Sequence, residues 1–244
     1  MAIYHFQARM VQRSAGQSAV QTAASRSGMR LYDERYGRTR QPVRRDTPRH
    51  SAVLLPAGAP VAWRDRSALW NEVEACEKRR DAGLAREIEV ALPAELPSGA
   101  ATDLACGFAD SIFVQSGMVV DLNVWTDRRA DGAPAPWASL LLTTRVVEGG
   151  RFGRKVRAWN DRATLMAWRE QWAAIANSAL AAHGFAVTLD HRSNAARSIA
   201  LEPQNKIGAA SLRRSRAGEV MERVEEHVEI ARRNAARIAG RSIE

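Results

Sequence analysis

Arginine is the residue type of this chain best placed to do chemistry, and that chemistry is the binding of phosphate. Of the 36 basic residues in the 244-residue chain, 33 are arginines, whose planar guanidinium matches a phosphate group. The first fifty residues hold ten arginines against Asp33, Glu34 and Asp46, a net charge of +7 in a chain of net charge +9. Residues 205–244 add +3, so the middle is about neutral. A basic end on a neutral core predicts a polyanionic partner, usually nucleic acid. An Arg- and Ala-rich coding bias would explain the excess of Arg over Lys equally well, but not the clustering.

Thiol, zinc and membrane functions have little support in the sequence. Cys76 and Cys106 lie in segments predicted as helices, where buried free thiols are favoured over a disulfide. No group of Cys and His residues has the spacing of a zinc site. The chain has no run of eighteen apolar residues, and its start alternates like a strand instead of resembling a secretory signal. A cytoplasmic protein with no membrane partner is therefore predicted.

The elements that must position these residues alternate between strands and helices. Strands are predicted from period-two alternation, and helices from apolar stripes that end at Gly or Pro. The predicted strands cover residues 2–12, 50–55, 85–92, 118–125 and 137–145, and the predicted helices cover residues 17–30, 65–80, 98–114, 160–183 and 218–239. Residues 31–49 are predicted as an exposed loop and residues 152–157 as a basic turn. Because the close strand pairs look antiparallel, we predict an α/β fold with a central, mostly antiparallel sheet flanked by helices.

The segment Asp131–Arg145, DGAPAPWASLLLTTR, is the most informative stretch. It predicts a Pro-kinked turn that leads into a buried strand. Alternation places two sets of side chains on matching faces of this strand and its predicted neighbour: Trp137, Ser139 and Thr143 on one, and Asp121, Asn123 and Trp125 on the other. We therefore expect a pocket walled by two tryptophans, with Asp121 at its edge.

Many segments, in one order over nearly the whole chain, resemble the MobA/MobL-type relaxases of the MobQ class, the DNA-nicking enzymes of plasmid transfer. They are MAIYHF, GQSAV with the RSG that follows, LYDERYG, LWNEVE, AREIEVALP, DGAPAP with LLLTTR, DHRS and LEPQNKIG. No single motif is decisive, but so many in one order are specific. The resemblance implies the fold of the HUH endonucleases.

The resemblance also implies four catalytic groups, and all four positions are substituted here. In that family a tyrosine after the first strand attacks a DNA phosphodiester, and three histidines hold a divalent cation such as Mg²⁺ or Mn²⁺ that polarises the phosphate. The tyrosine position falls at Ser25, and the histidine positions fall at Trp125, Trp137 and Ser139. An indole N–H is only a donor, and a neutral hydroxyl is a poor ligand beside imidazole. No metal or other cofactor is predicted for this chain, and whether it is an enzyme stays open. His5 and His50, predicted on adjacent strands, are interpreted as structural residues.

DNA binding is the function expected to outlast the loss of these groups. Single-stranded DNA from an origin of transfer is the predicted partner, other transfer proteins are further candidate partners, and the chain is expected to be a monomer. The predicted DNA contacts are Arg26, Arg30, Arg35, Arg145, His191 and Arg192. Trp125 and Trp137 would either stack on bases or fill the vacated metal cavity, and these alternatives stay open. Glu87 and Glu89 would either support a family metal site or be solvated.

Three hypotheses about function follow, from different classes. The first is a relaxase-like domain over residues 1–205, impaired or inactive in nicking but able to recognise origin DNA, with a charged helical extension over residues 206–244 that could lead to a further domain. The second is an active nickase in which Ser25, Tyr32 or Tyr36 is the relocated nucleophile. The third is a stable scaffold that does not bind DNA.

Overall fold

The computed structural model describes residues 4–44, 46–129, 131–193, 195–202, 214–215 and 218–241. Contacts divide the chain into two units, Met1–Asp190 and His191–Glu244. The predicted domain boundary between residues 205 and 206 lies outside the described residues. Among the residues that are described, no helix is both long and apolar enough to cross a membrane.

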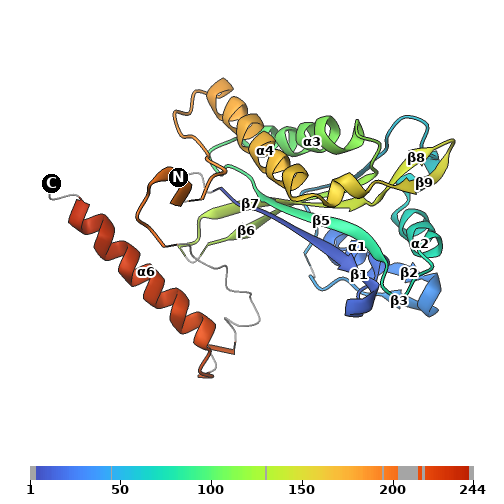
Figure 1. Ribbon diagram of the computed structural model, residues 1–244, viewed down its shortest axis with the longest axis horizontal. Helices are drawn as coiled ribbons and strands as arrows, with labels where there is room; N and C mark the ends of the chain where they lie inside the picture. Colours follow the sequence, from blue (N-terminus) through green and yellow to red (C-terminus); the bar gives the residue numbers. More distant parts are fainter. Residues whose placement is uncertain are drawn as a thin grey trace. The chain divides into compact units, whose positions relative to one another are not determined.

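A five-stranded sheet forms the centre of the first unit (Figure 1). The strand order is β1-β5-β7-β6-β4, and every neighbouring pair is antiparallel. The strands are β1 (Phe6–Gln12), β4 (His50–Leu54), β5 (Gly83–Ala91), β6 (Val120–Arg128) and β7 (Pro134–Thr143). Helices flank this sheet, so the predicted fold class is confirmed.

Helices α3 (Ser98–Phe108) and α4 (Arg162–Ala182) cover one face of the sheet (Figure 1). A π-helical turn, Ala109–Val114, continues α3. Every second residue of the central strands points to this face and joins the core there; Ile88, Leu122 and Leu140 are examples. Because successive strand residues point to opposite faces, this packing sets which residues face the other way.

Helices α1 (Ala19–Ser27) and α2 (Arg66–Cys76) pack on the opposite face. Ser18 begins α1, and its Oγ accepts a hydrogen bond from Gln21 N at 3.3 Å, as an N-cap residue does. The small side chains Ala19, Ala23 and Ala24 are buried. Helix α1 ends at Gly28, whose φ of 71° suits a residue without a Cβ.

Two short hairpins were not predicted. Strands β2 (Leu31–Asp33) and β3 (Arg38–Arg40) pair through the 3-10 turn η2 (Glu34–Tyr36), so the predicted loop over residues 31–49 is wrong in this part. Strands β8 (Arg145–Glu148) and β9 (Arg151–Lys155) pair where a basic turn was predicted. Strands β2 and β3 have three residues each, too few to display a period, which is why alternation missed them.

The second unit contains helix α6 (Glu222–Arg241), close to the predicted helix over residues 218–239. Within this unit Glu202 forms ion pairs with Arg233 at 2.7 Å and with Arg237 at 2.9 Å. These two arginines hold the pKa of Glu202 below its ordinary value. The charged face of α6 is therefore partly used for contacts inside its own unit.

Candidate functional site

Two tryptophans from neighbouring strands form the centre of the candidate site. Trp125 on β6 and Trp137 on β7 are direct partners in the antiparallel register. Their rings stack with centroids 6.2 Å apart and planes 15° apart. Trp125 is only 1% exposed, whereas Trp137 is half-buried. Trp125 is therefore packed into the protein and does not wall an open pocket as predicted.

Both indole N–H groups of this pair already donate to protein acceptors. Trp125 Nε1 donates to the carbonyl oxygen of Arg26 at 3.1 Å, which ties β6 to the last turn of α1. Trp137 Nε1 donates to Asp127 Oδ2 at 3.1 Å. The indoles offer no lone pair toward the space between them.

Two guanidinium groups lie over the rings. The Arg44 guanidinium carbon is 4.6 Å from the centroid of Trp125, and that of Arg26 is 5.8 Å from the centroid of Trp137. Both distances are in the range of a cation–π contact. Arg44 also pairs with Asp46 at 2.7 Å and Asp127 at 2.6 Å. The bonds to both carboxylates raise the pKa of Arg44, and the bond from Arg44 lowers the pKa of Asp46.

Glu87 and Glu89 on β5 neutralise the second guanidinium. Arg26 bonds Glu87 through Nε and Glu89 through Nη2, the latter at 2.6 Å. Arg9 on β1 reaches the same two carboxylates at 2.6 and 3.4 Å. Glu87 is 2% exposed. Its role is therefore that of a buried counter-ion for arginines, and neither alternative from the sequence describes it.

The two serines complete the group of substituted positions. Ser139 lies two residues beyond Trp137 on the same face, opposite Asn123 and Glu89. It is fully buried, and its Oγ has no hydrogen-bond partner among the described residues. Ser25 precedes Arg26 in α1, and its Oγ donates to the Gln21 carbonyl at 2.9 Å. Trp125, Trp137 and Ser139 thus lie together on one face of β6 and β7, and Ser25 adjoins this group through its neighbour Arg26, whose carbonyl accepts from Trp125.

Asp121 is not at the edge of a pocket as predicted; it lies within a buried polar cluster. It accepts hydrogen bonds from Arg66 Nε at 2.9 Å, Trp70 Nε1 at 3.0 Å and Asn123 Nδ2 at 3.0 Å. Complete burial raises the pKa of Asp121, and the charge of Arg66 offsets part of this effect. The bonds from Arg66 and Trp70 join α2 to β6, and the bond from Asn123 lies within β6, so the role of Asp121 is structural.

The site does not fit a divalent cation. Within the described residues no three His, Cys, Asp or Glu side chains are arranged to hold a metal ion. His5 adjoins β1 and His50 lies on β4, at opposite edges of the sheet. The prediction that they share adjacent strands is wrong, because β5, β7 and β6 lie between them. The carboxylates at the Trp pair are already paired with Arg26 and Arg44, and the indoles supply no lone pair for a metal ion.

The predicted DNA contacts separate into different environments. Arg30 and Arg35 are exposed. Arg145 is instead bonded to Glu77 at 2.7 Å and to the Gly153 carbonyl at 2.9 Å, and so anchors the β8–β9 hairpin. His191 and Arg192 belong to the second unit.

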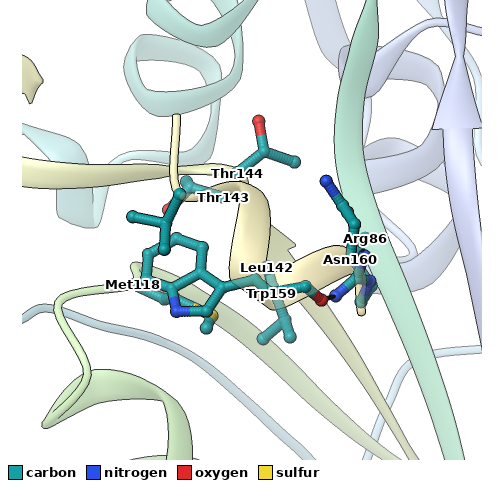
Figure 2. A pocket seen from close by; sticks show the side chains of 8 residues that line it. Arg86, Met118, Leu142, Thr143, Thr144, Trp159 and Asn160 are labelled. Atoms are coloured by element: carbon teal, nitrogen blue, oxygen red, sulfur yellow. Dashed lines mark hydrogen bonds between the residues drawn. The ribbon is translucent and has the colours of Figure 1, made fainter. Parts of the chain in front are cut away.

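A cavity on the α3–α4 face is too small to be a ligand site. It measures about 10 Å³ and is partly lined by Arg86, Met118 and Trp159 (Figure 2). Arg86 donates to the Trp159 carbonyl and to Asn160 Oδ1, and lies 5.2 Å from the Trp168 ring centroid. Burial lowers the pKa of Arg86. This arginine ties β5 to the segment before α4.

The arginine partners Arg9 and Arg44 were missed as site residues by sequence reasoning. Once β1 is known to pair with β5, the register places Arg9 directly opposite Glu87 on the same face of the sheet. No local signal identifies Arg44, because Asp127 lies far from it in the sequence.

Comparison with known proteins agrees with this architecture. The MobA/MobL family model matches residues 17–216. Mobilization protein MobL of Acidithiobacillus ferridurans is 35% identical over 241 residues, covering 86% of this chain and 63% of that protein. Conjugal transfer protein TraA of Rhizobium radiobacter is 33% identical over 242 residues, covering 86% of this chain and 22% of TraA. The chain thus spans less than two thirds of the length of these relatives.

A solved structure supports the same assignment. It is described as "Molecular Basis of Vancomycin Resistance Transfer in Staphylococcus aureus", and it is similar with a TM-score of 0.72 and 32% sequence identity. The match covers 79% of this chain and all of the other. The fold is that of a relaxase-type domain. The chain belongs to the MobA/MobL family of plasmid mobilisation and conjugal transfer proteins.

Proposed function

We propose that this chain binds single-stranded DNA from an origin of transfer and does not nick it by the metal-dependent tyrosine chemistry of its family. The observation that carries this proposal is the stacked pair Trp125–Trp137, which stands where the family's histidine ligands are expected. The names of the relatives, mobilisation and conjugal transfer proteins, support the DNA partner.

The chemistry of the four substituted positions supports the loss of nicking. Neither indole has a lone pair for a metal, and both N–H groups are engaged. The Ser25 hydroxyl donates to the Gln21 carbonyl of its own helix, and the serine side chain is shorter than that of tyrosine by a whole ring. No metal or other cofactor is therefore part of the proposed function.

The remaining expectations about the whole protein are proposals of the same kind. We propose that residues 1–205 act as the DNA-binding domain and that residues 206–244 extend it toward other parts or partners of the transfer system. We propose that the chain works as a monomer in the cytoplasm.

An adduct assay tests this function directly. The protein is incubated with supercoiled and with single-stranded origin DNA, with and without Mn²⁺, and the products are separated under denaturing conditions. The expected result is salt-sensitive binding with no covalent protein–DNA adduct, since phosphate contacts are screened by salt. An adduct would overturn the proposal in favour of a relocated nucleophile. Absence of binding at low salt would favour the scaffold.

A second candidate, the nickase with a relocated nucleophile, has one supporting observation. Tyr32 and Tyr36 are 52% and 46% exposed, so their hydroxyls are accessible. If the assay gives an adduct, Tyr32→Phe and Tyr36→Phe, each alone, identify the nucleophile by abolishing it.

A further inference from the structure

We infer that the β2–β3 hairpin, Leu31–Arg40, is the surface that holds the nucleic-acid strand, with Tyr32 and Tyr36 stacking on bases and the adjacent arginines contacting phosphates. This inference rests on the proposed function and assigns the contact to one element. It moves the aromatic contact away from Trp125 and Trp137, whose rings are stacked on each other.

The exposed side chains of the hairpin and of Arg30 before it are of the kinds that bind a single strand of nucleic acid. Tyr32 and Tyr36 are about half exposed, and among the described residues they are the only aromatic side chains in the group of exposed large hydrophobic residues. Arg30, Arg35 and Arg38 are exposed and have no ion pair with any described residue. Bases stack on aromatic rings whatever their sequence, and arginines track the backbone, in proteins that bind single strands.

The tyrosine ring at the tip of the hairpin is held in place by arginines. The guanidinium carbons of Arg40 and Arg38 lie 4.7 and 5.8 Å from the centroid of Tyr36. Arg40 is itself fixed, because its Nε donates to the fully buried Asp33 at 2.7 Å. A ring that is held before binding loses little conformational freedom when a base stacks on it.

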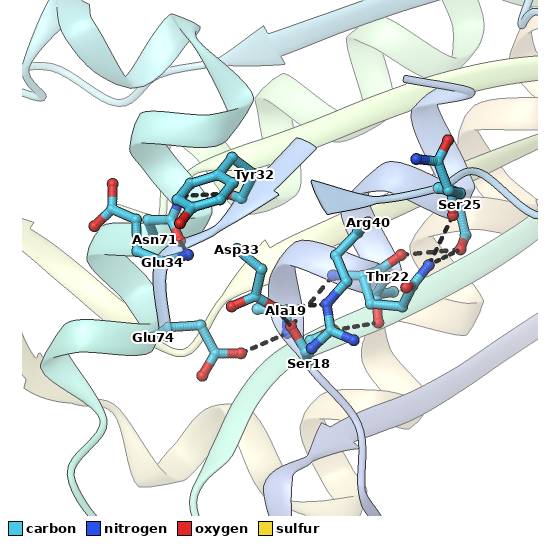
Figure 3. A network of polar contacts seen from close by, with 12 residues as sticks. Ser18, Ala19, Thr22, Ser25, Tyr32, Asp33, Glu34, Arg40, Asn71 and Glu74 are labelled. Atoms are coloured by element: carbon cyan, nitrogen blue, oxygen red, sulfur yellow. Dashed lines mark hydrogen bonds and ion pairs between the residues drawn. The ribbon is translucent and has the colours of Figure 1, made fainter. Parts of the chain in front are cut away.

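A buried polar network anchors the hairpin to helices α1 and α2 (Figure 3). Asp33 also accepts from Ser18 Oγ at 2.8 Å, at the start of α1. Asn71 of α2 donates to the Tyr32 carbonyl at 2.8 Å and accepts from Glu34 N at 3.0 Å. The hairpin is therefore a rigid platform, and only its outer side chains are available to a ligand.

The hairpin also adjoins the position where the family's nucleophile is expected. Gln21 Nε2 donates both to Ser25 Oγ at 3.1 Å and to the Gln41 carbonyl, just after β3, at 3.0 Å. A strand held on the hairpin would therefore run beside the end of α1. This continuity favours a nucleic-acid strand over a protein as the occupant.

Fluorescence anisotropy with a labelled single-stranded oligonucleotide of mixed sequence tests the inference. Tyr32→Leu with Tyr36→Leu keeps apolar bulk and removes both ring faces, and should weaken binding by about 5- to 150-fold for each base stack lost. Tyr32→Phe with Tyr36→Phe keeps the rings and should bind like the parent. Arg30→Gln, Arg35→Gln and Arg38→Gln together should reduce the slope of log affinity against log salt by about 2.

Matched controls separate this inference from the proposed function. Arg154→Gln, Arg157→Gln and Arg162→Gln together remove the same charge from exposed positions of the same unit, and should change the slope less than the hairpin variant does. Circular dichroism and thermal melting check that each variant is folded. Parent-like binding by the Tyr→Leu variant and a parent-like salt slope of the hairpin Arg→Gln variant together overturn the inference and leave the proposed function standing. No binding by the parent overturns both, and an adduct overturns only the proposed loss of nicking.

Discussion

The arginines around the Trp pair and those of the β2–β3 hairpin have the same chemistry but opposite surroundings. At the Trp pair, Arg26 and Arg44 face carboxylates from β5, β6 and the segment before β4. Arg35 and Arg38 of the hairpin and Arg30 directly before it are exposed, and within the described part of the chain no carboxylate pairs with them. The first region is closed by its own counter-ions, whereas the second presents its charge to solvent.

This difference shows that the number of arginines in a segment overstates the positive charge that the segment offers to a partner. Among the described arginines of the first fifty residues, five are neutralised by acids, most of them from later in the chain: Arg9, Arg13, Arg26, Arg40 and Arg44. Their role is to bind elements of the fold together. The charge available to a partner is therefore smaller than the sequence indicates, and it is concentrated near the hairpin.

Removal of Trp125 should give the largest change in stability. Trp125→Ala opens a cavity in the buried core beside α1, and should lower the free energy of unfolding by about 3–5 kcal/mol. Trp137→Ala should cost roughly half as much, because its ring is half-buried. Urea denaturation measures both. If the comparison holds, neither variant weakens single-strand binding under conditions where it is folded. A loss of affinity as large as that of the tyrosine variant would show that the Trp pair contacts the strand.

Loss of the Asp33–Arg40 ion pair, which anchors the hairpin, should give the second-largest fall in the free energy of unfolding. Asp33→Asn leaves Arg40, which is 8% exposed, without a counter-ion, and should cost about 3 kcal/mol. Unlike the Trp125 variant, it should also weaken strand binding, because Arg40 positions Tyr36. Asp81→Asn is the control, since it breaks the exposed pair with Arg79 and should leave both quantities unchanged. Unaltered strand binding by a folded Asp33→Asn protein would contradict the anchoring role.

Most of the sheet was predictable from sequence because β1, β5, β6 and β7 have seven or more residues each. Strand β5 displays Ile88 and Val90 on one face and Glu87 and Glu89 on the other, and the structure confirms this alternation. The convergence of Ser25, Trp125, Trp137 and Ser139 came from the resemblance, not from periodicity. The ion pairs were not predictable, because each depends on which strands become neighbours. The separation of His5 from His50 by three strands is the clearest case.

Restoring imidazoles tests whether the Trp pair occupies the former metal site. The variant Trp125→His, Trp137→His, Ser139→His should bind Mn²⁺, because neutral imidazole supplies the lone pair that indole lacks. At a Mn²⁺ concentration about 100 times its Kd, binding should raise the free energy of unfolding by about 2.7 kcal/mol. The parent should show no such increase. Adding Ser25→Tyr then asks whether a covalent DNA adduct returns. Failure of the folded variant to bind Mn²⁺ would mean that the positions assigned to the ligands are wrong.

The smallest effect concerns the surface pair that holds Arg44 over Trp125. Arg44 donates to Asp46 and keeps the pKa of this carboxyl below its ordinary value of 3.8. The folded state therefore binds this proton less readily than the unfolded chain, so the pair stabilises the fold above pH ~4, and this contribution is lost as the pH falls through the lowered pKa. Because Asp46 is largely exposed, solvent screening should limit the effect to about 0.5 kcal/mol. Asp46→Asn should remove that part of the pH dependence of unfolding and leave strand binding at neutral pH unchanged. A change in strand affinity would instead link the closed region to the open one through Arg44, and so break the comparison between them.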